Sequence, residues 1–245
     1  MSDNIDEDIE FDDFDDFDDF DDFQKELDKD WAEVEAAFAL VDEGFEWWTI
    51  LEDVIVHTEE FISRSAQLKK GVLITFAKKD EDLSFLIGNL ISGVLSLYED
   101  FVHKVLDSCL NKNGYMEHAL SNLEKLSRKN KRRLRFQKEE EINVDSLRAA
   151  LKKATLNDPE IIRSLALELF DLSLPAPSAE IYAKIISVRN AYIHNGGKLD
   201  GQQLKLTGKD FLIVHRLFDN LISNYVQHMI NLANSFMDNA DEIGS

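Results

Sequence analysis

An arginine, an asparagine and a histidine lie close together in the segment RNAYIHNGG, residues 189 to 197. Arg189 carries a permanent planar charge that suits a phosphate, and the imidazole of His194 can accept or donate a proton near neutral pH. RNA carries its own nucleophile, the 2′-hydroxyl, so strand cleavage needs only a base, an acid and a cation over the developing charge. The segment therefore has the residue types for RNA cleavage without a metal ion.

The same residues also fit purely structural roles. An arginine and a histidine at this spacing arise readily by chance, and a cationic histidine near the end of a helix is an ordinary partner of the helix dipole. The other five histidines show no metal-ligand spacing, and we find no phosphate-binding loop or nucleophile-elbow motif. We therefore predict no metal and no cofactor.

The helical period places these residues on a helix from about residue 178 to residue 194. Ser178 can cap its start, and Asn195-Gly196-Gly197 supplies a stop signal. Asn190 and His194 fall on one face, nearly opposite an apolar face made of Ile181, Ile185, Val188 and Tyr192. Ile186 and Ile193 lie between the two faces, which indicates that a second protein surface meets this helix.

The rest of the chain also favours helices, because three Pro and ten Gly in 245 residues leave little punctuation for a many-stranded β fold. A hairpin is expected at KLDGQQLKLT, residues 198 to 207. The other predicted helices cover about residues 31–41, 48–71, 81–111, 115–131, 144–154, 159–172 and 207–237. The single cysteine, Cys109, excludes a disulfide framework and is expected to be buried.

The apolar run at residues 83–98 is shorter than the roughly twenty residues of a spanning helix, so we interpret it as a core helix. The chain starts with acidic residues instead of a basic and apolar signal. We therefore expect a cytoplasmic protein without a membrane partner.

RNAYIHNGG at the end of a penultimate helix, followed by a short hairpin and a long closing helix, resembles the HEPN superfamily, particularly its RiboL-PSP-like branch. Arg189, Asn190 and His194 match the family's motif position by position. SLYEDFVHKVL, residues 96 to 106, is similar to an earlier core helix of the family, with Glu99 at its acidic position. A helix partner for His103 is the alternative role of Glu99.

The resemblance implies an all-α, HEPN-like helical bundle with a short β-hairpin before the last helix. It also implies a homodimer across the Arg/His helices, with a metal-independent endoribonuclease site built from both copies. In that site Arg189 would stabilise the transition state, His194 would act as general acid or base, and Asn190 would orient the phosphate or His194. The products in the family are a 2′,3′-cyclic phosphate and a 5′-hydroxyl.

A basic strip, EKLSRKNKRRLRFQK at residues 124 to 138, has eight Lys or Arg and no acid after Glu124. Such a strip could track a phosphate backbone, or it could be a solvated helix end. The candidate RNA-binding residues are Arg128, Lys131, Arg132, Arg133 and Arg135.

The formal net charge of −21 excludes a wholesale basic coat for nucleic acid, and two thirds of it lies in residues 1 to 30. Residues 11 to 23 read FDDFDDFDDFDDF. Because Asp is a poor helix former and like charges repel, we predict a disordered acidic tail over residues 1–23. The tail either solvates the chain or imitates a nucleic-acid strand, bound to the chain's own basic strip or to a partner protein.

These observations predict three parts: the tail at 1–23, N-terminal helices at 24–80 and a HEPN-like domain at 81–240. The leading function is an endoribonuclease that acts as a toxin or antiphage effector and is regulated by its tail. An antitoxin or another regulatory protein is a candidate partner. The alternative is a non-catalytic HEPN-like adaptor whose acidic, aromatic tail binds a partner.

Overall fold

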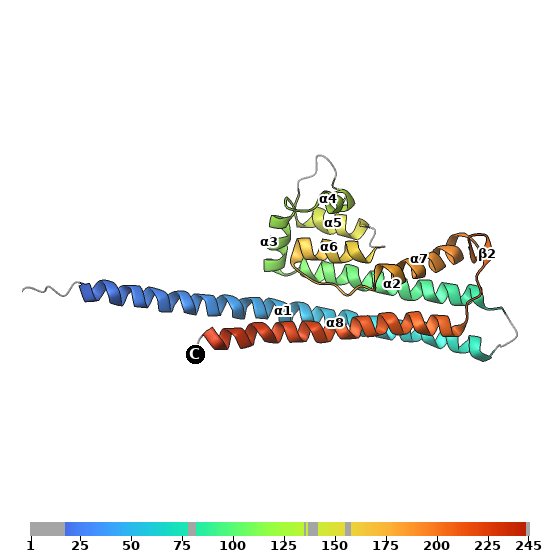
Figure 1. Ribbon diagram of the computed structural model, residues 1–245, viewed down its shortest axis with the longest axis horizontal. Helices are drawn as coiled ribbons and strands as arrows, with labels where there is room; N and C mark the ends of the chain where they lie inside the picture. The colour runs from blue at the N-terminus through green and yellow to red at the C-terminus, as the bar shows by residue number, and fades with distance from the viewer. Residues whose placement is uncertain (1–17, 78–81, 135, 137–141, 155–157, 244–245) are drawn as a thin grey trace, which may run out of the picture. The chain divides into compact units, whose positions relative to one another are not determined.

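The computed structural model describes residues 18–77, 82–134, 136, 142–154 and 158–243. In these ranges the chain forms eight helices and one two-stranded hairpin (Figure 1). The predicted all-α class is confirmed. Most of the predicted tail, residues 1–17, lies outside the described residues, and helix α1 (Asp18–Ala77) begins inside the FDD repeat.

The chain falls into two compact units. The larger unit runs from Phe45 to Asn234, and the smaller unit combines Met1–Gly44 with Ser235–Ser245. Helices α1 and α8 (Gly208–Ile243) contribute residues to both units. Residues 45–77 of α1 therefore belong to the same compact unit as the candidate catalytic helix.

Two predicted helix boundaries were wrong. Residues 31–41 and 48–71 form one helix, because Gly44 alone costs only about 1 kcal/mol and the turns that follow it are held by buried apolar side chains. The predicted helix at 115–131 is split into α3 (Asn113–Asn122) and α4 (Arg128–Leu134). The break occurs because the Ser127 hydroxyl accepts a hydrogen bond from the backbone N–H of Asn130 and so starts a new helix.

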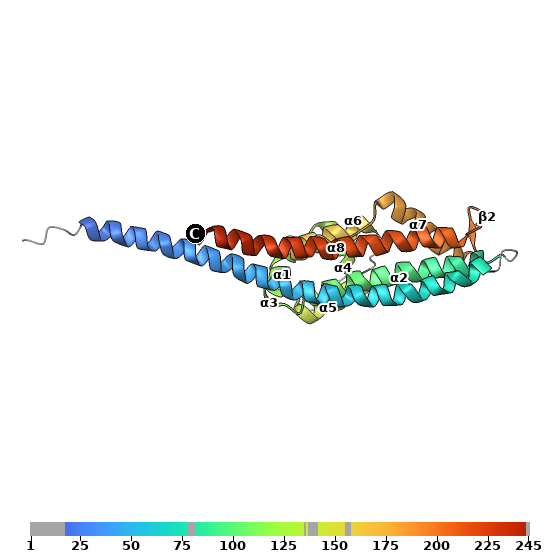
Figure 2. The same cartoon turned by 90° about the horizontal axis from the view of Figure 1, so that it is seen from below.

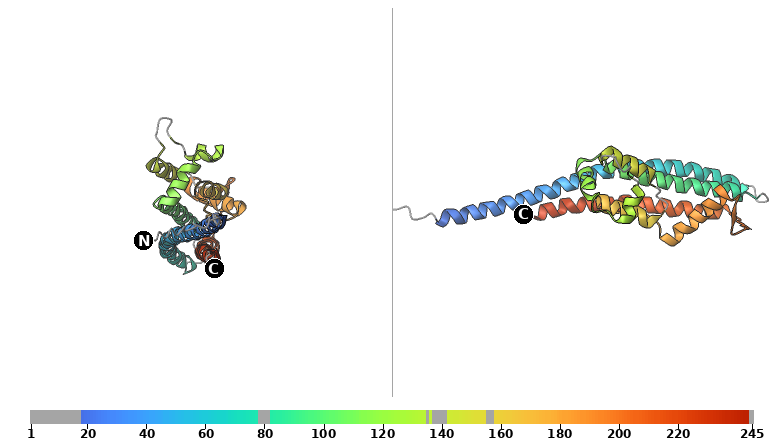
Figure 3. Two further views of the ribbon diagram at one scale, coloured as in Figure 1. Left: turned by 90° about the vertical axis from the view of Figure 1, so that its left-hand side faces the viewer. Right: turned by 90° about the horizontal axis from the view of Figure 1, so that it is seen from above.

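Four helical segments of the larger unit lie side by side, as the view from below (Figure 2) and the end-on and top views (Figure 3) show. They are residues 45–77 of α1, α2 (Ser84–Cys109), α7 (Ala179–His194) and residues 208–234 of α8. The ring of Tyr98 on α2 connects α2 with α7 and α8, because its centroid lies 6.3 Å from that of Tyr182 on α7 and 4.8 Å from that of Phe218 on α8. Its hydroxyl donates to the carbonyl of Pro175 at 2.8 Å, which ties the segment before α7 to the core.

A second layer covers one side of α2, made of α3, α4, α5 (Val144–Lys153) and α6 (Pro159–Phe170) (Figure 1). The side chain of Asn143 caps α5 by accepting from the backbone of Ser146 at 3.0 Å. Asp158 caps α6, as the Asp158-Pro159 pair predicts, by accepting from the backbone of Glu160. Local capping thus fixes where α5 and α6 begin.

The predicted hairpin is also present. Strand β1 (Lys198–Leu199) pairs antiparallel with β2 (Gln202–Gln203). The two residues between them, Asp200 and Gly201, have φ angles of 50° and 81°. Positive φ at both positions is what a two-residue hairpin turn of this twist requires, and Asp-Gly is among its preferred sequences.

Helix α2 is the one described helix that is long and apolar enough to cross a bilayer by length and composition. In the structure 56% of its apolar window is buried inside the protein. Cys109 at its end is also fully buried, and burial raises the pKa of the thiol to about 12. These features confirm the predicted core helix and the predicted buried cysteine.

Candidate functional site

Helix α7 carries the candidate catalytic residues, and its ends are fixed by short-range contacts. At its start the side chain of Ser178 accepts from the backbone of Ile181, as predicted. Near its end the buried Tyr192 donates a hydrogen bond to the carbonyl of Leu204 at 2.7 Å, and its ring packs against Phe85 of α2. The end of α7 is therefore held between α2 and the segment that follows the hairpin.

Gly88 makes the approach of α7 to α2 possible. A Cβ atom at Gly88 would lie 2.3 Å from Cγ of Tyr192. No side chain fits at that separation, so α2 needs a glycine where the tyrosine ring lies.

Arg189 forms an ion pair with Glu99 of α2, with 3.6 Å between Nη1 and Oε1. Both side chains are partly buried, at 28% and 22% exposure. Burial raises the pKa of Glu99, while the charge of Arg189 opposes that rise. The structure thus brings together two candidate residues that are distant in sequence.

Asn190 and His194 are exposed on the other side of α7. On an ideal helix His194 is rotated by about 140° from Arg189, so the two side chains leave the helix in different directions. One copy of the chain therefore presents its imidazole to solvent and turns its guanidinium toward α2.

The chain turns sharply after His194, as the Asn195-Gly196-Gly197 sequence predicts. The backbone N–H groups of Asn195 and Gly197 both donate to the carbonyl of Ala191, which closes the helix. Gly196 and Gly197 have φ angles of 59° and 83°. A Cβ at Gly196 would meet nothing within 4 Å, so the backbone next to His194 is open to an incoming group.

Exposed isoleucines lie on the same helix. Ile181 and Ile193 are 43% and 47% exposed, although both are large apolar side chains. Singly exposed apolar residues are common. The exposure of Ile193 fits the predicted second surface, whereas Ile186, the other residue of that prediction, is half-buried. Ile181 was expected on the apolar face, and its exposure shows that this end of the face is not covered within one copy.

The basic strip lies elsewhere in the larger unit. Helix α4 packs against α5 and α6, and the views place it far from the hairpin end of α7 (Figures 1 and 2). Arg128, Lys131 and Arg132 are exposed, Arg133 is half-buried, and Arg135 lies outside the described residues. The structure therefore does not join the strip to Arg189 and His194.

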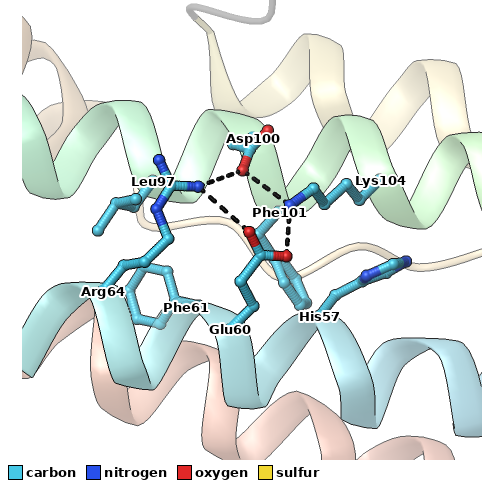
Figure 4. A pocket seen from close by; sticks show the side chains of 8 residues that line it. All are labelled: His57, Glu60, Phe61, Arg64, Leu97, Asp100, Phe101 and Lys104. Carbon is cyan, nitrogen blue, oxygen red and sulfur yellow. Dashed lines mark hydrogen bonds and ion pairs between the residues drawn. The ribbon is translucent and has the colours of Figure 1, made fainter.

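Sequence reasoning missed a cluster of four charged residues between α1 and α2 (Figure 4). Arg64 contacts Glu60 at 3.4 Å and Asp100 at 3.0 Å, and Lys104 contacts the same two carboxylates at 2.5 and 3.1 Å. Glu60–Arg64 and Asp100–Lys104 are i, i+4 pairs, so the sequence could have predicted these two contacts within a helix but not the two contacts between the helices. With two acids and two bases the cluster is neutral and acts as a clamp between two helices.

His57 lies beside this cluster. Its Nε2 atom is 3.0 Å from the hydroxyl of Ser108 on α2. Burial lowers the pKa of His57, while nearby Asp53 opposes the shift. This histidine is therefore a packing residue of the α1–α2 contact.

Among the described residues no group of three or more His, Cys, Asp or Glu side chains is arranged to hold a metal ion. Comparisons with protein-family models, with curated proteins and with solved structures found no match to this chain.

Proposed function

We propose that the chain is a HEPN-type, metal-independent endoribonuclease with its site at the hairpin end of α7. The observation that carries the proposal is the pairing of Arg189 with Glu99 on a helix that also exposes Asn190 and His194. A cation held by a carboxylate and an exposed imidazole are residue types that cleavage of RNA uses. Because the two side chains leave α7 in different directions, the proposal brings them together from two copies of the chain.

In the proposed reaction the 2′-hydroxyl attacks the adjacent phosphorus and loses its proton to a base. The 5′-oxygen leaves and takes a proton from an acid, which gives a 2′,3′-cyclic phosphate and a 5′-hydroxyl. His194 serves as base or acid, Arg189 stabilises the developing charge on the phosphate, and Asn190 orients the phosphate or the imidazole. Glu99 holds the guanidinium in place.

The proposal includes a homodimer across α7. One copy offers a single His194, whereas the reaction uses both a base and an acid. A second copy related by a twofold axis would supply the second imidazole and would cover Ile181 and Ile193. We further propose that the HEPN-like bundle is made by the four side-by-side helical segments, and that the protein acts in the cytoplasm as a toxin or antiphage effector.

The exposed cations of α4 are proposed to hold RNA outside the cleavage site. Because α4 lies away from His194 within one copy, they would bind a distant stretch of the strand or a site on the second copy. The acidic tail is proposed to compete with RNA for them, alone or through an antitoxin or regulatory partner.

The test is cleavage of a labelled RNA in the presence of EDTA. We expect the wild-type chain to cleave and His194→Ala to lose at least about 100-fold in rate, as for a lost general acid or base. His228→Ala is the matched control, because His228 is an exposed histidine of α8. If the wild type does not cleave the RNA, or if the two variants cleave it at equal rates, the endoribonuclease proposal is wrong.

A non-catalytic adaptor is the second candidate. The observation that favours it is the exposure of Trp31, Val34 and Phe38 on α1, at 60%, 43% and 66%. Aromatic side chains of this size, left in solvent, are typical of a surface that binds another protein.

A further inference from the structure

Apolar residues of α1 in the smaller unit follow a seven-residue repeat. Leu27, Trp31, Val34, Phe38 and Val41 are separated by four, three, four and three residues. This spacing repeats every 3.5 residues on average, and it is the pattern of a helix that packs along another helix in a coiled coil. We call these five residues the α1 seam.

The middle of the α1 seam is open to solvent. Trp31 is 60% exposed, Val34 is 43% exposed and Phe38 is 66% exposed. Three consecutive residues of the α1 seam, two of them aromatic, therefore form one exposed apolar strip. A strip of this kind favours a helical partner, because a partner helix covers both positions of every repeat.

Acidic residues border the α1 seam mainly on one side. In the repeat the positions on that side are Asp28, Glu35 and Asp42, whereas the positions on the other side are Asp30 and Ala37. Glu35 and Asp42 are exposed in the structure. Since bordering positions of two paired helices face each other, their charges select the partner and its direction.

These charges argue against a second copy of α1 as the occupant. In an antiparallel pair the acidic border of one helix would face the acidic border of the other, and in a parallel pair Asp30 of one helix would face Glu35 of the other. Like charges in such positions are destabilising. A helix with basic borders would instead form ion pairs along the acidic side and with Asp30.

We propose that the α1 seam binds an amphipathic helix of a partner protein, with an apolar heptad strip bordered by Lys or Arg. This binding surface is separate from the proposed cleavage site on α7, and it does not depend on catalysis. It gives the chain a docking site for a basic helical segment, on a helix that begins inside the FDD repeat.

The test uses the full chain and two synthetic helical peptides of about 28 residues, or four heptads. Both carry Leu at the two seam positions of each heptad, and they differ in having Lys or Glu at the bordering positions. We expect calorimetry to show binding of the Lys peptide and at least tenfold weaker binding of the Glu peptide. Equal binding of the two peptides would overturn the charge argument and the proposal with it.

The seam itself is tested by the double variant Trp31→Gln with Phe38→Gln, because Gln keeps a high helix propensity. We expect the double variant to bind the Lys peptide at least tenfold more weakly than the wild type does. Ile213→Gln should leave this binding unchanged. Ile213 is a fair control since it is 67% exposed on α8. Unchanged binding in the double variant would overturn the proposal, and circular dichroism checks that the helix content is kept.

Charge reversal gives the sharpest outcome. The double variant Glu35→Lys with Asp42→Lys should reverse the order of the two affinities, so that the Glu peptide binds more tightly than the Lys peptide. Sedimentation of the chain alone supplies the remaining outcome. Self-association that is lost in Trp31→Gln with Phe38→Gln would identify a second copy as the occupant and overturn the proposal. None of these experiments measures RNA cleavage. The docking proposal for the α1 seam can therefore fail while the endoribonuclease proposal stands, and the reverse also holds.

Discussion

Glu99 and Asp100 are consecutive residues of α2, yet they face different neighbours. Glu99 pairs with Arg189 of α7 at 3.6 Å, whereas Asp100 contacts Arg64 of α1 at 3.0 Å. Asp100 also contacts Lys104 at 3.1 Å, one turn further along α2. The same turn of one helix thus holds a single ion pair on one side and a closed network on the other.

The difference lies in how many acids each cation meets. Arg64 and Lys104 each contact two carboxylates, so their charges are balanced inside the network. Arg189 has one carboxylate at a longer distance, and a guanidinium has five N–H donors. Arg64 also keeps N–H donors, because it meets both carboxylates through Nη1. The difference is that an anion beside Arg64 would face two carboxylates, whereas an anion beside Arg189 would face Glu99 alone among the described contacts.

The largest expected effect comes from removing either arginine. In the proposed enzyme, Arg189→Ala should lower kcat/KM for RNA cleavage by about 100- to 1000-fold, the usual loss for a donor to the transition state. Arg64→Ala should change the rate by less than about twofold, because an exposed ion pair contributes little.

Arg189→Lys distinguishes charge from geometry at that position. We expect a partial recovery, since an ammonium keeps the charge but lacks the planar fork. Urea midpoints of all three variants show whether folding is intact. An equal loss of rate in Arg64→Ala and Arg189→Ala would mean that both arrangements are structural.

The next largest effect concerns the two glycines of α2 that face these neighbours. Gly88→Ala would place Cβ 2.3 Å from the ring of Tyr192, which Phe85 and the hydrogen bond to Leu204 hold in place. We expect a loss of about 1–3 kcal/mol in the free energy of unfolding, as for an overpacked core. Cleavage should fall as well, because the end of α7 would move.

Gly93→Ala is the matched substitution on the side of α1. Its Cβ would lie 3.1 Å from the end of the flexible Leu68 side chain, which can move aside. Alanine also favours a helix over glycine by about 1 kcal/mol, so we expect little change in stability. Thermal unfolding of the two variants makes the comparison, and a larger loss in Gly93→Ala would contradict it.

Local chemistry explains which parts of this fold could be predicted from the sequence. Ser178, the Asp158-Pro159 pair and the Asp200-Gly201 turn act within a few residues, so each gave the right start or turn. The break after α3 was missed because Ser127 is one of many serines in the chain, and only its hydrogen bond to Asn130 marks it as a cap.

Contacts between residues that are distant in the sequence could not be predicted in the same way. Glu99 became a candidate through a family resemblance, and the structure adds its pairing with Arg189. The network of Arg64 and Asp100 joins residues from separate helices, and periodicity along one helix carries no information on the register between two. The separation of α4 from the hairpin end of α7 could likewise not be predicted from the sequence.

The smallest expected effect is a difference of sign in the pH dependence of stability. Burial raises the pKa of Glu99, so the folded chain holds this proton more tightly than the unfolded chain does. Its ionisation therefore costs stability as the pH rises through the interval above its ordinary pKa. The hydrogen bond from Lys104 lowers the pKa of Glu60, so Glu60 stabilises the fold above its ordinary pKa and loses that contribution as the pH falls.

The variants Glu99→Gln and Glu60→Gln should consequently diverge. Relative to the wild type, the urea midpoint of Glu99→Gln should rise as the pH increases above the ordinary pKa of a glutamate, because the wild type alone ionises a partly buried carboxyl. The midpoint of Glu60→Gln should fall over the range in which Glu60 ionises, because only the wild type gains the ion pair with Lys104. Slopes of the same sign would mean that Glu99 and Glu60 lie in equivalent surroundings, and the contrast between the two sides of α2 would then not hold.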